Sequence, residues 1–301
     1  MFFSASTLAA TAALLSAASA VSAQSVPNAA SPLQLAEVSA EYANSGLNDT
    51  GNAGFGISLD AKALLNVFLA NGEEIQNGQS YSVDAVNSMP SISVTPSNST
   101  ASWFNQSAEY TLVLADASSL GDPDPQGNYR HYLANSLTGT AGSGENLTFV
   151  PEGGNTVTSF AAPGPIAGTG PHRYAWLMFV QPNNFTAPQN LSSNAGPGHW
   201  YVQSYVQSTG LELVAASFFT VENGQPTGSV ASTQAVNTAT LVVSTSTGGS
   251  NAAQSTGASG SKTGSQSNPS STGSPSSGAS KSVAVSVGAG LVGLVGFVAL
   301  C

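Results

Sequence analysis

The sequence predicts a mainly β protein, an antiparallel β-sandwich with one or two short helices. Short apolar segments alternate with turn signals rich in Gly, Pro and Asn, which is typical of antiparallel sheets. The strongest segment is the unbroken apolar run at residues 174–180, which Pro171 and Pro182 flank. Its length fits a buried strand. Helix signals are few. Residues 200–208 have helical spacing, with Trp200 packed on the sandwich and Gly210 as the expected C-cap.

Four further strands are expected along the chain, each from its apolar or alternating pattern. They are residues 64–69 before the turn Asn71-Gly72, residues 92–95, residues 110–114 leading into Asp116, and residues 217–221 before Asn223-Gly224. The run Asp122-Pro-Asp-Pro125 is expected to form a loop turn.

Composition divides the chain into four parts. Residues 1–23 have the apolar stretch and small residues of a secretory signal, and residues 24–226 hold the expected domain. No carboxylate follows Glu222, and residues 227–282 are rich in Ser, Thr and Gly, which predicts a flexible stalk. Residues 283–301 are an apolar tail with no Lys or Arg after it, as in a GPI-attachment signal. We expect an extracellular protein, GPI-anchored at the plasma membrane or in the cell wall; the alternative is a single-pass membrane helix.

Six N-x-S/T motifs lie in the expected domain. In a secreted chain they predict N-glycosylation and a surface position for each asparagine. The motifs begin at Asn48, Asn98, Asn105, Asn146, Asn184 and Asn190.

The charges are few and acidic overall. The formal net charge is −10, and five Lys and Arg residues are present, which argues against a nucleic-acid partner. The single cysteine, Cys301, leaves no internal disulfide. Two arginines stand directly beside histidines, in Arg130-His131 and His172-Arg173, so these pairs look placed rather than scattered. We expect a monomer.

These pairs carry a family resemblance. Gly170-Pro-His-Arg-Tyr174, Arg130-His-Tyr-Leu133, the strand into Asp116, and residues 205–221 resemble the phosphatidylethanolamine-binding protein family, its secreted fungal branch most of all. The resemblance covers about residues 54–222. It implies a β-sandwich with a small pocket for phosphate-like anions or phospholipid head groups, and some members inhibit proteases or carboxypeptidases. By resemblance, Asp116, His131, His172 and Tyr174 line the pocket.

Two departures from the family pattern affect this assignment. An Asp-Pro-Asp run is usual directly after the first strand, where this chain has Asp116-Ala-Ser118; the later Asp122-Pro-Asp124 is the alternative. Strand continuity and the fifteen residues from Asp116 to His131 favour Asp116. In addition, Gly164-Pro-Ile-Ala167 stands where a double proline is common, so one wall of the pocket differs.

The residue chemistry agrees with a binding site. Imidazoles and the Tyr174 hydroxyl can donate to an anion, and Asp116 can orient a histidine. Arg130 and Arg173 either add positive potential to the site or brace the loop through salt bridges. A metal site is disfavoured because the arginines would repel a dication, and neither a metal nor a cofactor is expected.

The chain lacks a Gly-x-Ser-x-Gly motif, so we expect a binding protein rather than an enzyme. The alternatives are a protease or carboxypeptidase inhibitor and a structural cell-wall glycoprotein.

Overall fold

The structure of the chain is a computed structural model that describes residues 29–50, 54–122, 124–225, 227–228 and 235–241. These residues belong to one of two units into which the chain divides, residues 1–247. The expected signal peptide, most of the expected stalk and the expected GPI signal lie outside the described residues. Among the described residues, no helix is both apolar enough and long enough to span a bilayer.

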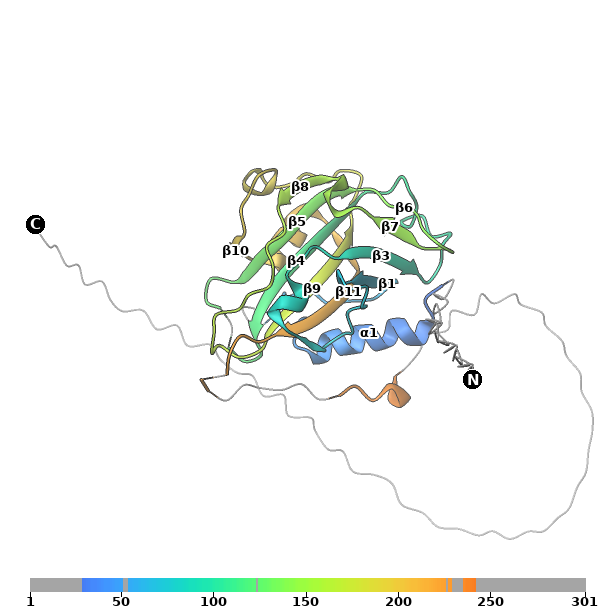
Figure 1. Cartoon of the computed structure of the whole chain (residues 1–301). Coiled ribbons are helices and arrows are strands. Elements are labelled where there is room, and N and C mark those ends of the chain that lie inside the picture. The colour runs from blue at the N-terminus through green and yellow to red at the C-terminus, as the bar shows by residue number, and fades with distance from the viewer. Residues whose placement is uncertain (1–28, 51–53, 123, 226, 229–234, 242–301) are drawn as a thin grey trace, which may run out of the picture. The chain divides into compact units, whose positions relative to one another are not determined.

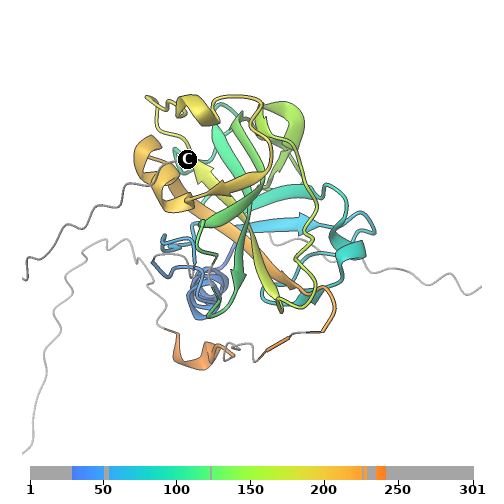
Figure 2. The same ribbon diagram turned by 90° about the vertical axis from the view of Figure 1, so that its left-hand side faces the viewer.

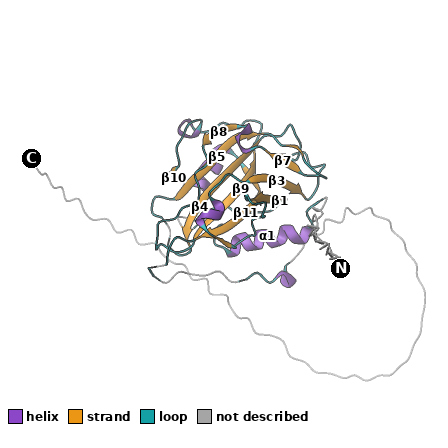
Figure 3. Ribbon diagram, viewed as in Figure 1, coloured by secondary structure: helices purple, strands orange, loops and turns teal. Residues whose placement is uncertain are grey.

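Two twisted sheets form the framework, and strands dominate the fold (Figures 1 and 3). The small sheet has the order β1-β3-β7-β6, and the large sheet has the order β10-β5-β4-β9-β11-β2, with β8 also paired to β5. Pairing is antiparallel except between β11 and β2. The strands are β1 (Ala63–Phe68), β2 (Ser80–Tyr81), β3 (Ser91–Pro96), β4 (Tyr110–Ser119), β5 (Asn128–Leu137), β6 (Thr140–Ala141), β7 (Leu147–Phe149), β8 (Asn155–Thr158), β9 (His172–Val180), β10 (Gly198–Trp200) and β11 (Glu212–Val221).

Apolar side chains cover both faces of the large sheet. Leu112, Leu114 and Trp176 face the small sheet, whereas Val113 and Leu177 face the opposite side. This explains the unbroken apolar run in β9, because a strand buried on both faces does not need to alternate. The five expected strands are confirmed as β1, β3, β4, β9 and β11.

Two α-helices cover the outer face of the large sheet. Figure 2 shows α1 in blue and α2 in gold on the side away from the light-blue strands of the small sheet. Helix α1 (Pro32–Asn44) begins with a capping box between Ser31 and Gln34 and a proline at its first turn. Short 3₁₀ helices complete the fold: η2 (Val83–Val86), η3 (Pro151–Gly153), η4 (Gln189–Leu191) and η5 (Thr238–Thr240).

The expected helix at residues 200–208 begins later than predicted. His199 and Trp200 belong to β10, because their backbone pairs with the edge of β5, and α2 (Val202–Thr209) starts only after an extended Tyr201. Trp200 is buried as expected. Gly210 caps the helix in the left-handed conformation, which L-residues other than Gly rarely adopt.

One expected glycosylation position departs from the surface. Asn146 is only 7% exposed, so its side chain is covered in the folded domain. Asn48 is half-buried, and the remaining four asparagines are exposed. The prediction that all six lie on the surface is therefore wrong for Asn146, where the next residue, Leu147, enters β7 and carries the chain into the core.

Candidate functional site

A carboxylate and an imidazole meet where β4 and β9 lie side by side. The Asp116 Oδ2 atom lies 2.8 Å from Nδ1 of His172, and both side chains are largely buried. Asp116 pairs with Tyr174 across the two strands. His172 and Tyr174 are two positions apart at the start of β9, so their side chains lie on the same face of the sheet. Because an ionised carboxylate only accepts, Asp116 fixes the proton of His172 on Nδ1.

The backbone after Asp116 bulges, and Arg173 holds the bulge from the opposite face. The register shifts between Asp116 and Ser119, and Ser118 adopts a φ of 60°. The Ser118 N–H donates to Asp116 Oδ1 at 2.6 Å, and the Arg173 guanidinium donates to the carbonyls of Ala117 at 2.8 Å and Ser118 at 3.1 Å. Arg173 also donates to the Ser45 carbonyl at 2.9 Å.

The placement of Arg173 corrects the expectation that it binds ligand. Its side chain is 4% exposed and points away from His172, as strand alternation requires. It braces the loop through backbone carbonyls, and burial lowers its pKa to about 10.

A second bulge turns His131 toward the site. Leu114 pairs with Tyr132, and Ala115 pairs with Arg130, so His131 is the extra residue on β5. A bulge re-aims side chains, and here it puts His131 on the face of Tyr174, with ring centroids 5.3 Å apart.

Arg130 consequently lies on the other face of the sheet. Its guanidinium carbon stands 5.2 Å from the Trp200 ring centroid, Nε donates to Thr158 Oγ1 at 2.7 Å, and Nη2 donates to the Gly196 carbonyl at 2.8 Å. Arg130 therefore does not join the candidate site, contrary to expectation. The site holds neither of the two arginines.

Tyr174 is the centre of an aromatic cluster. Its ring is fully buried and stacks with His172 on one side and Phe219 on the other, at 6.4 and 5.7 Å between centroids. The hydroxyl makes no hydrogen bond of good geometry with any described residue, although Asp116 and the Gly164 backbone lie near it. Burial, aided by the negative charge of Asp116, raises the pKa of this hydroxyl, so it keeps its proton and can donate.

His131 is an uncharged donor at neutral pH. Its Nδ1 lies 2.9 Å from the Ala161 carbonyl, which requires a proton on that nitrogen. Burial lowers the pKa of His131 below its ordinary value of 6.5, against the opposing effects of Ala161 and Asp116. The neutral His131 ring therefore offers the site an accepting nitrogen, and the Tyr174 hydroxyl is the donor that remains beside the Asp116 carboxylate.

The loop at residues 161–171 covers the site. Thr169 Oγ1 lies 2.8 Å from His172 Nε2, and the Ser119 hydroxyl donates to the Thr169 carbonyl at 2.7 Å. The loop is fastened to the end of the domain: Gly168 donates to the Asn223 carbonyl at 2.9 Å, and Thr227 donates to the Gly168 carbonyl at 2.9 Å. Thr169 thus occupies the outer nitrogen of His172.

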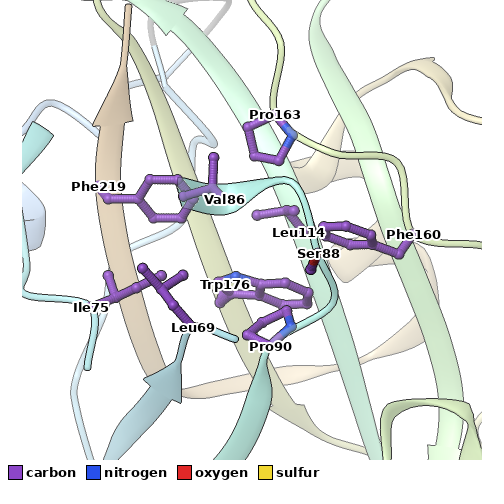
Figure 4. Close-up of a pocket in the computed structure, with 10 residues that line it drawn as sticks. All are labelled: Leu69, Ile75, Val86, Ser88, Pro90, Leu114, Phe160, Pro163, Trp176 and Phe219. Carbon is purple, nitrogen blue, oxygen red and sulfur yellow. The ribbon is translucent and has the colours of Figure 1, made fainter. Parts of the chain in front are cut away.

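A small apolar hollow adjoins this cluster on the same face. Leu114 lies two residues before Asp116, and Trp176 lies two residues after Tyr174; both line the hollow (Figure 4). Pro163 from the covering loop closes it together with Phe160, which directly precedes the loop, and Phe219. Its volume is about 10 Å³, room for one water-sized group. Sequence reasoning missed Phe160, Phe219 and Thr169; only the proximity of Thr169 to the Gly-Pro-His-Arg-Tyr motif pointed to it.

The expected alternative aspartates lie elsewhere. Asp122 and Asp124 belong to a turn, in which the Asp122 N–H donates to the Ser119 carbonyl and Asp124 Oδ1 accepts from the Gln126 N–H at 2.8 Å. Asp124 also lies 3.6 Å from Nδ1 of the exposed His199. Asp116, not Asp122 or Asp124, contacts His172.

The hydrogen-bond order Asp116–His172–Thr169 resembles that of a nucleophile triad. However, the Thr169 hydroxyl has a second acceptor within reach, the Ile166 carbonyl at 2.7 Å. When His172 Nε2 carries a proton, the hydroxyl donates its own proton to this carbonyl and not to the imidazole. No group of three or more His, Cys, Asp or Glu side chains in the described part of the chain is placed to hold a metal ion. The arrangement offers a ligand the Tyr174 hydroxyl as a donor, with the two imidazoles beside it.

The fold and these residues agree with a family match. The model of the family "Phosphatidylethanolamine-binding protein" matches residues 68–219, half of the chain, and the chain belongs to this family. The matched region contains Asp116, His131, His172 and Tyr174.

Two yeast proteins are similar in sequence. An uncharacterised protein of Saccharomyces cerevisiae is 26% identical over 175 residues, which cover 53% of this chain and 81% of that protein. The carboxypeptidase Y inhibitor of the same yeast is 31% identical over 80 residues, or 25% of this chain and 36% of the inhibitor. The chain thus matches little more than a third of the inhibitor's length.

The fold of this chain is similar to solved structures of other proteins. The carboxypeptidase Y inhibitor, in complex with its cognate proteinase, is 21% identical and matches with a TM-score of 0.49, covering 61% of this chain and 94% of the inhibitor. A phosphatidylethanolamine-binding protein from Plasmodium falciparum is 16% identical and has a TM-score of 0.42, covering 61% and 96% of the two chains.

Proposed function

We propose that this protein is a non-catalytic binding protein that holds a small anion, such as the phosphate of a phospholipid head group. The binding residues are Asp116, His131, His172 and Tyr174. The observation that carries the proposal is the Tyr174 hydroxyl, which is buried without a hydrogen-bond partner of good geometry on a ring that contacts both histidines. A buried unpaired donor is costly, and an anionic oxygen placed there would satisfy it.

Neither arginine reaches the site, so the anion would be held by the Tyr174 hydroxyl and by the two histidines. The Tyr174 hydroxyl is the donor while both imidazoles are neutral, and the outer nitrogens of His131 and His172 donate as well when the rings are protonated. A hydrogen bond to a charged oxygen contributes about 1.5–3 kcal/mol. Thr169 occupies His172 Nε2, so ligand entry requires this contact to open. The adjoining hollow would take a small apolar group of the ligand.

The test is calorimetric titration of the full chain, purified from a eukaryotic secretory host, with inorganic phosphate and with phosphorylethanolamine. Binding of either, weakened at least tenfold in His172→Ala, would support the proposal. Absence of binding to both ligands, or equal binding by His172→Ala, would contradict it. Comparing the two ligands tells free phosphate from a lipid head group.

A second candidate function is inhibition of a carboxypeptidase. The similarity to the carboxypeptidase Y inhibitor of yeast favours it. The measurement is the peptidase activity of carboxypeptidase Y with increasing amounts of the full chain. Inhibition that persists in His172→Ala would indicate an inhibitor that uses another surface, whereas unchanged activity would leave anion binding as the proposed function.

We also propose that the protein acts at the cell surface. The support lies in the sequence: the secretory signal at residues 1–23, the stalk at residues 227–282 and the apolar tail at residues 283–301. Phospholipase C specific for GPI should release the protein from intact cells. Retention after treatment, together with a Cys301 peptide in the mature protein, would indicate a membrane helix instead.

A further inference from the structure

A groove lies between β10, α2 and η4, outside the candidate anion site. Its volume is about 500 Å³, within the range of pockets that hold small organic ligands. We call it the β10–α2 groove. The residues that matter here are Asn190, Leu191, Trp200, Tyr201, Ser204 and Tyr205.

The groove has an aromatic floor and a polar rim, and the buried cation Arg130 also lines it. Trp200 and Tyr205 are buried, with their rings 5.3 Å apart, while Tyr201 is 46% exposed, one of the most exposed large apolar side chains in the described part of the chain. The rim carries the exposed hydroxyl of Ser204 and the exposed amide of Asn190. None of the lining residues is acidic. Aromatic faces beside hydroxyl and amide groups suit a ligand with both apolar faces and many hydroxyls, which is the chemistry of a sugar ring.

One sugar acceptor stands at the edge of this groove. Asn190 begins the motif Asn190-Leu-Ser192, is exposed, and lies in the short helix η4. Its side chain is exposed to solvent, so its nitrogen is accessible for modification. By contrast, the Nδ2 of Asn105 donates to the Ser102 carbonyl at 2.7 Å.

A glycan attached to Asn190 would be favoured over free ligands as the occupant of the β10–α2 groove. A sugar joined to Asn190 is tethered beside the floor, and tethering raises its effective concentration without any new contact. A free saccharide or a peptide would have to compete with it.

We propose that an N-linked glycan on Asn190 lies in the β10–α2 groove, with its first sugar against Tyr201 and the edge formed by Trp200 and Tyr205. The inference is independent of anion binding and requires only that the chain passes through the secretory pathway. In the folded glycoprotein, the glycan covers the exposed face of Tyr201 and stabilises the junction of β10 with α2.

The first measurement is mass spectrometry of glycopeptides from the full chain made in a eukaryotic secretory host. An N-acetylhexosamine on Asn190 is expected, and an unmodified Asn190 would overturn the proposal. Trimming the glycan to its first sugar with an endoglycosidase should leave the Tm unchanged, because that sugar makes the proposed contact.

The second measurement is a thermal double-mutant cycle. Asn190→Gln should lower the Tm by about 2–4 °C, the shift that corresponds to ~1 kcal/mol in a domain of this size. Asn184→Gln is the matched control, since Asn184 is also an exposed acceptor but lies outside the groove; it should change the Tm by less than half as much.

In a Tyr201→Ala background, Asn190→Gln should have little further effect, because residues in contact are not additive. Full additivity, or equal shifts in Asn190→Gln and Asn184→Gln, would overturn the proposal. If Tyr201→Ala does not fold, Ser192→Ala in the parent removes the glycan while keeping Asn190. It must then reproduce the Tm of Asn190→Gln, and a parental Tm in Ser192→Ala would equally overturn the proposal.

Discussion

The Asp116 carboxylate and the His172 imidazole are 56 positions apart in the chain and 2.8 Å apart in space. Two adjacent strands, β4 and β9, make this contact, and each contributes a side chain at the end where the sheet meets the covering loop. The pair fixes the orientation of His172, and with it the direction of the nitrogen that faces Thr169.

Replacing Asp116 should weaken anion binding. Asp116→Asn removes the charged acceptor of His172, and a hydrogen bond to a charged group contributes about 1.5–3 kcal/mol. We therefore expect phosphate affinity to fall about 10- to 100-fold, measured by calorimetry with the fold checked by circular dichroism. The double variant Asp122→Asn/Asp124→Asn is the control and should bind like the parent, because these residues lie in a turn. If Asp116→Asn kept the parental affinity and the double variant lost it, the pocket would lie at Asp122 and Asp124 instead.

Replacing Arg173 should reduce stability rather than remove a ligand contact. Arg173→Met leaves the carbonyls of Ser45, Ala117 and Ser118 without their donor, and each buried unsatisfied group costs about 1–3 kcal/mol. The Tm in a thermal scan should fall by more than ~5 °C. Lys62→Met is the control: its exposed ion pair with Glu212 should contribute at most about 1 kcal/mol. A parental Tm in Arg173→Met would show that the hydrogen bonds of Arg173 do not stabilise the bulge.

Acidification should destabilise the domain through His131. Burial holds the pKa of His131 below 6.5, so between that lowered pKa and 6.5 the unfolded chain binds more protons than the folded one. This contribution to stability is complete above pH 6.5 and is lost as the pH falls. Urea unfolding between pH 7 and pH 5 should show the loss, and His131→Gln should reduce it. An identical pH dependence in His131→Gln would contradict this origin.

Burial favours the neutral form of His131, and a bound anion should favour the protonated form instead. Negative charge beside the imidazole favours its protonated form, so affinity should rise as the pH falls from 7 to 5. A phosphodiester is the appropriate probe because it does not itself titrate in this range. Affinity that stays constant from pH 7 to pH 5 would indicate that the anion does not lie beside His131.

Alkaline titration should reveal a group of buried tyrosines that ionise at a higher pH than exposed tyrosines do. Burial raises the pKa of Tyr110 and Tyr205 to about 12 and raises the pKa of Tyr42 and Tyr174 as well. The folded state binds more protons than the unfolded state above pH 10, so stability should fall as the pH rises through 10 to 12. Absorbance at 295 nm should show at least these four of the eight tyrosines ionising only with unfolding. Titration of all eight below pH 11 with the fold intact would contradict this.

The buried strands could be predicted because their composition alone specifies burial. The apolar run of β9 needs cover on both faces, and its flanking prolines set its limits. Asp116 could be chosen over Asp122 because the strand pattern continues through residue 115 without a break. Helix α1 was missed even though Ser31, Pro32 and Gln34 form an N-terminal signature that is visible in the sequence.

The directions of Arg130 and Arg173 could not be predicted from the sequence. A strand sends neighbouring side chains to opposite faces, but the face that each takes depends on where a bulge falls. The bulge at His131 arises from pairing with β4, a contact that no local pattern encodes. For the same reason, the position of Thr169 over His172 depends on how the loop is fastened from the far end of the domain.

The fastening of the loop ties the site to the segment that follows β11. Thr227 donates both its backbone N–H and its hydroxyl to the Gly168 carbonyl, and Asn223 Nδ2 donates to the Pro165 carbonyl at 3.1 Å. Tension applied to the chain beyond residue 228 meets these bonds before it reaches the ladder of β11. Such a pull would lift residues 165–168 and draw Thr169 from His172 while the sheets remain intact. Loss of the bonds at Asn223 and Thr227 would therefore free the loop over His172 without breaking a strand of either sheet.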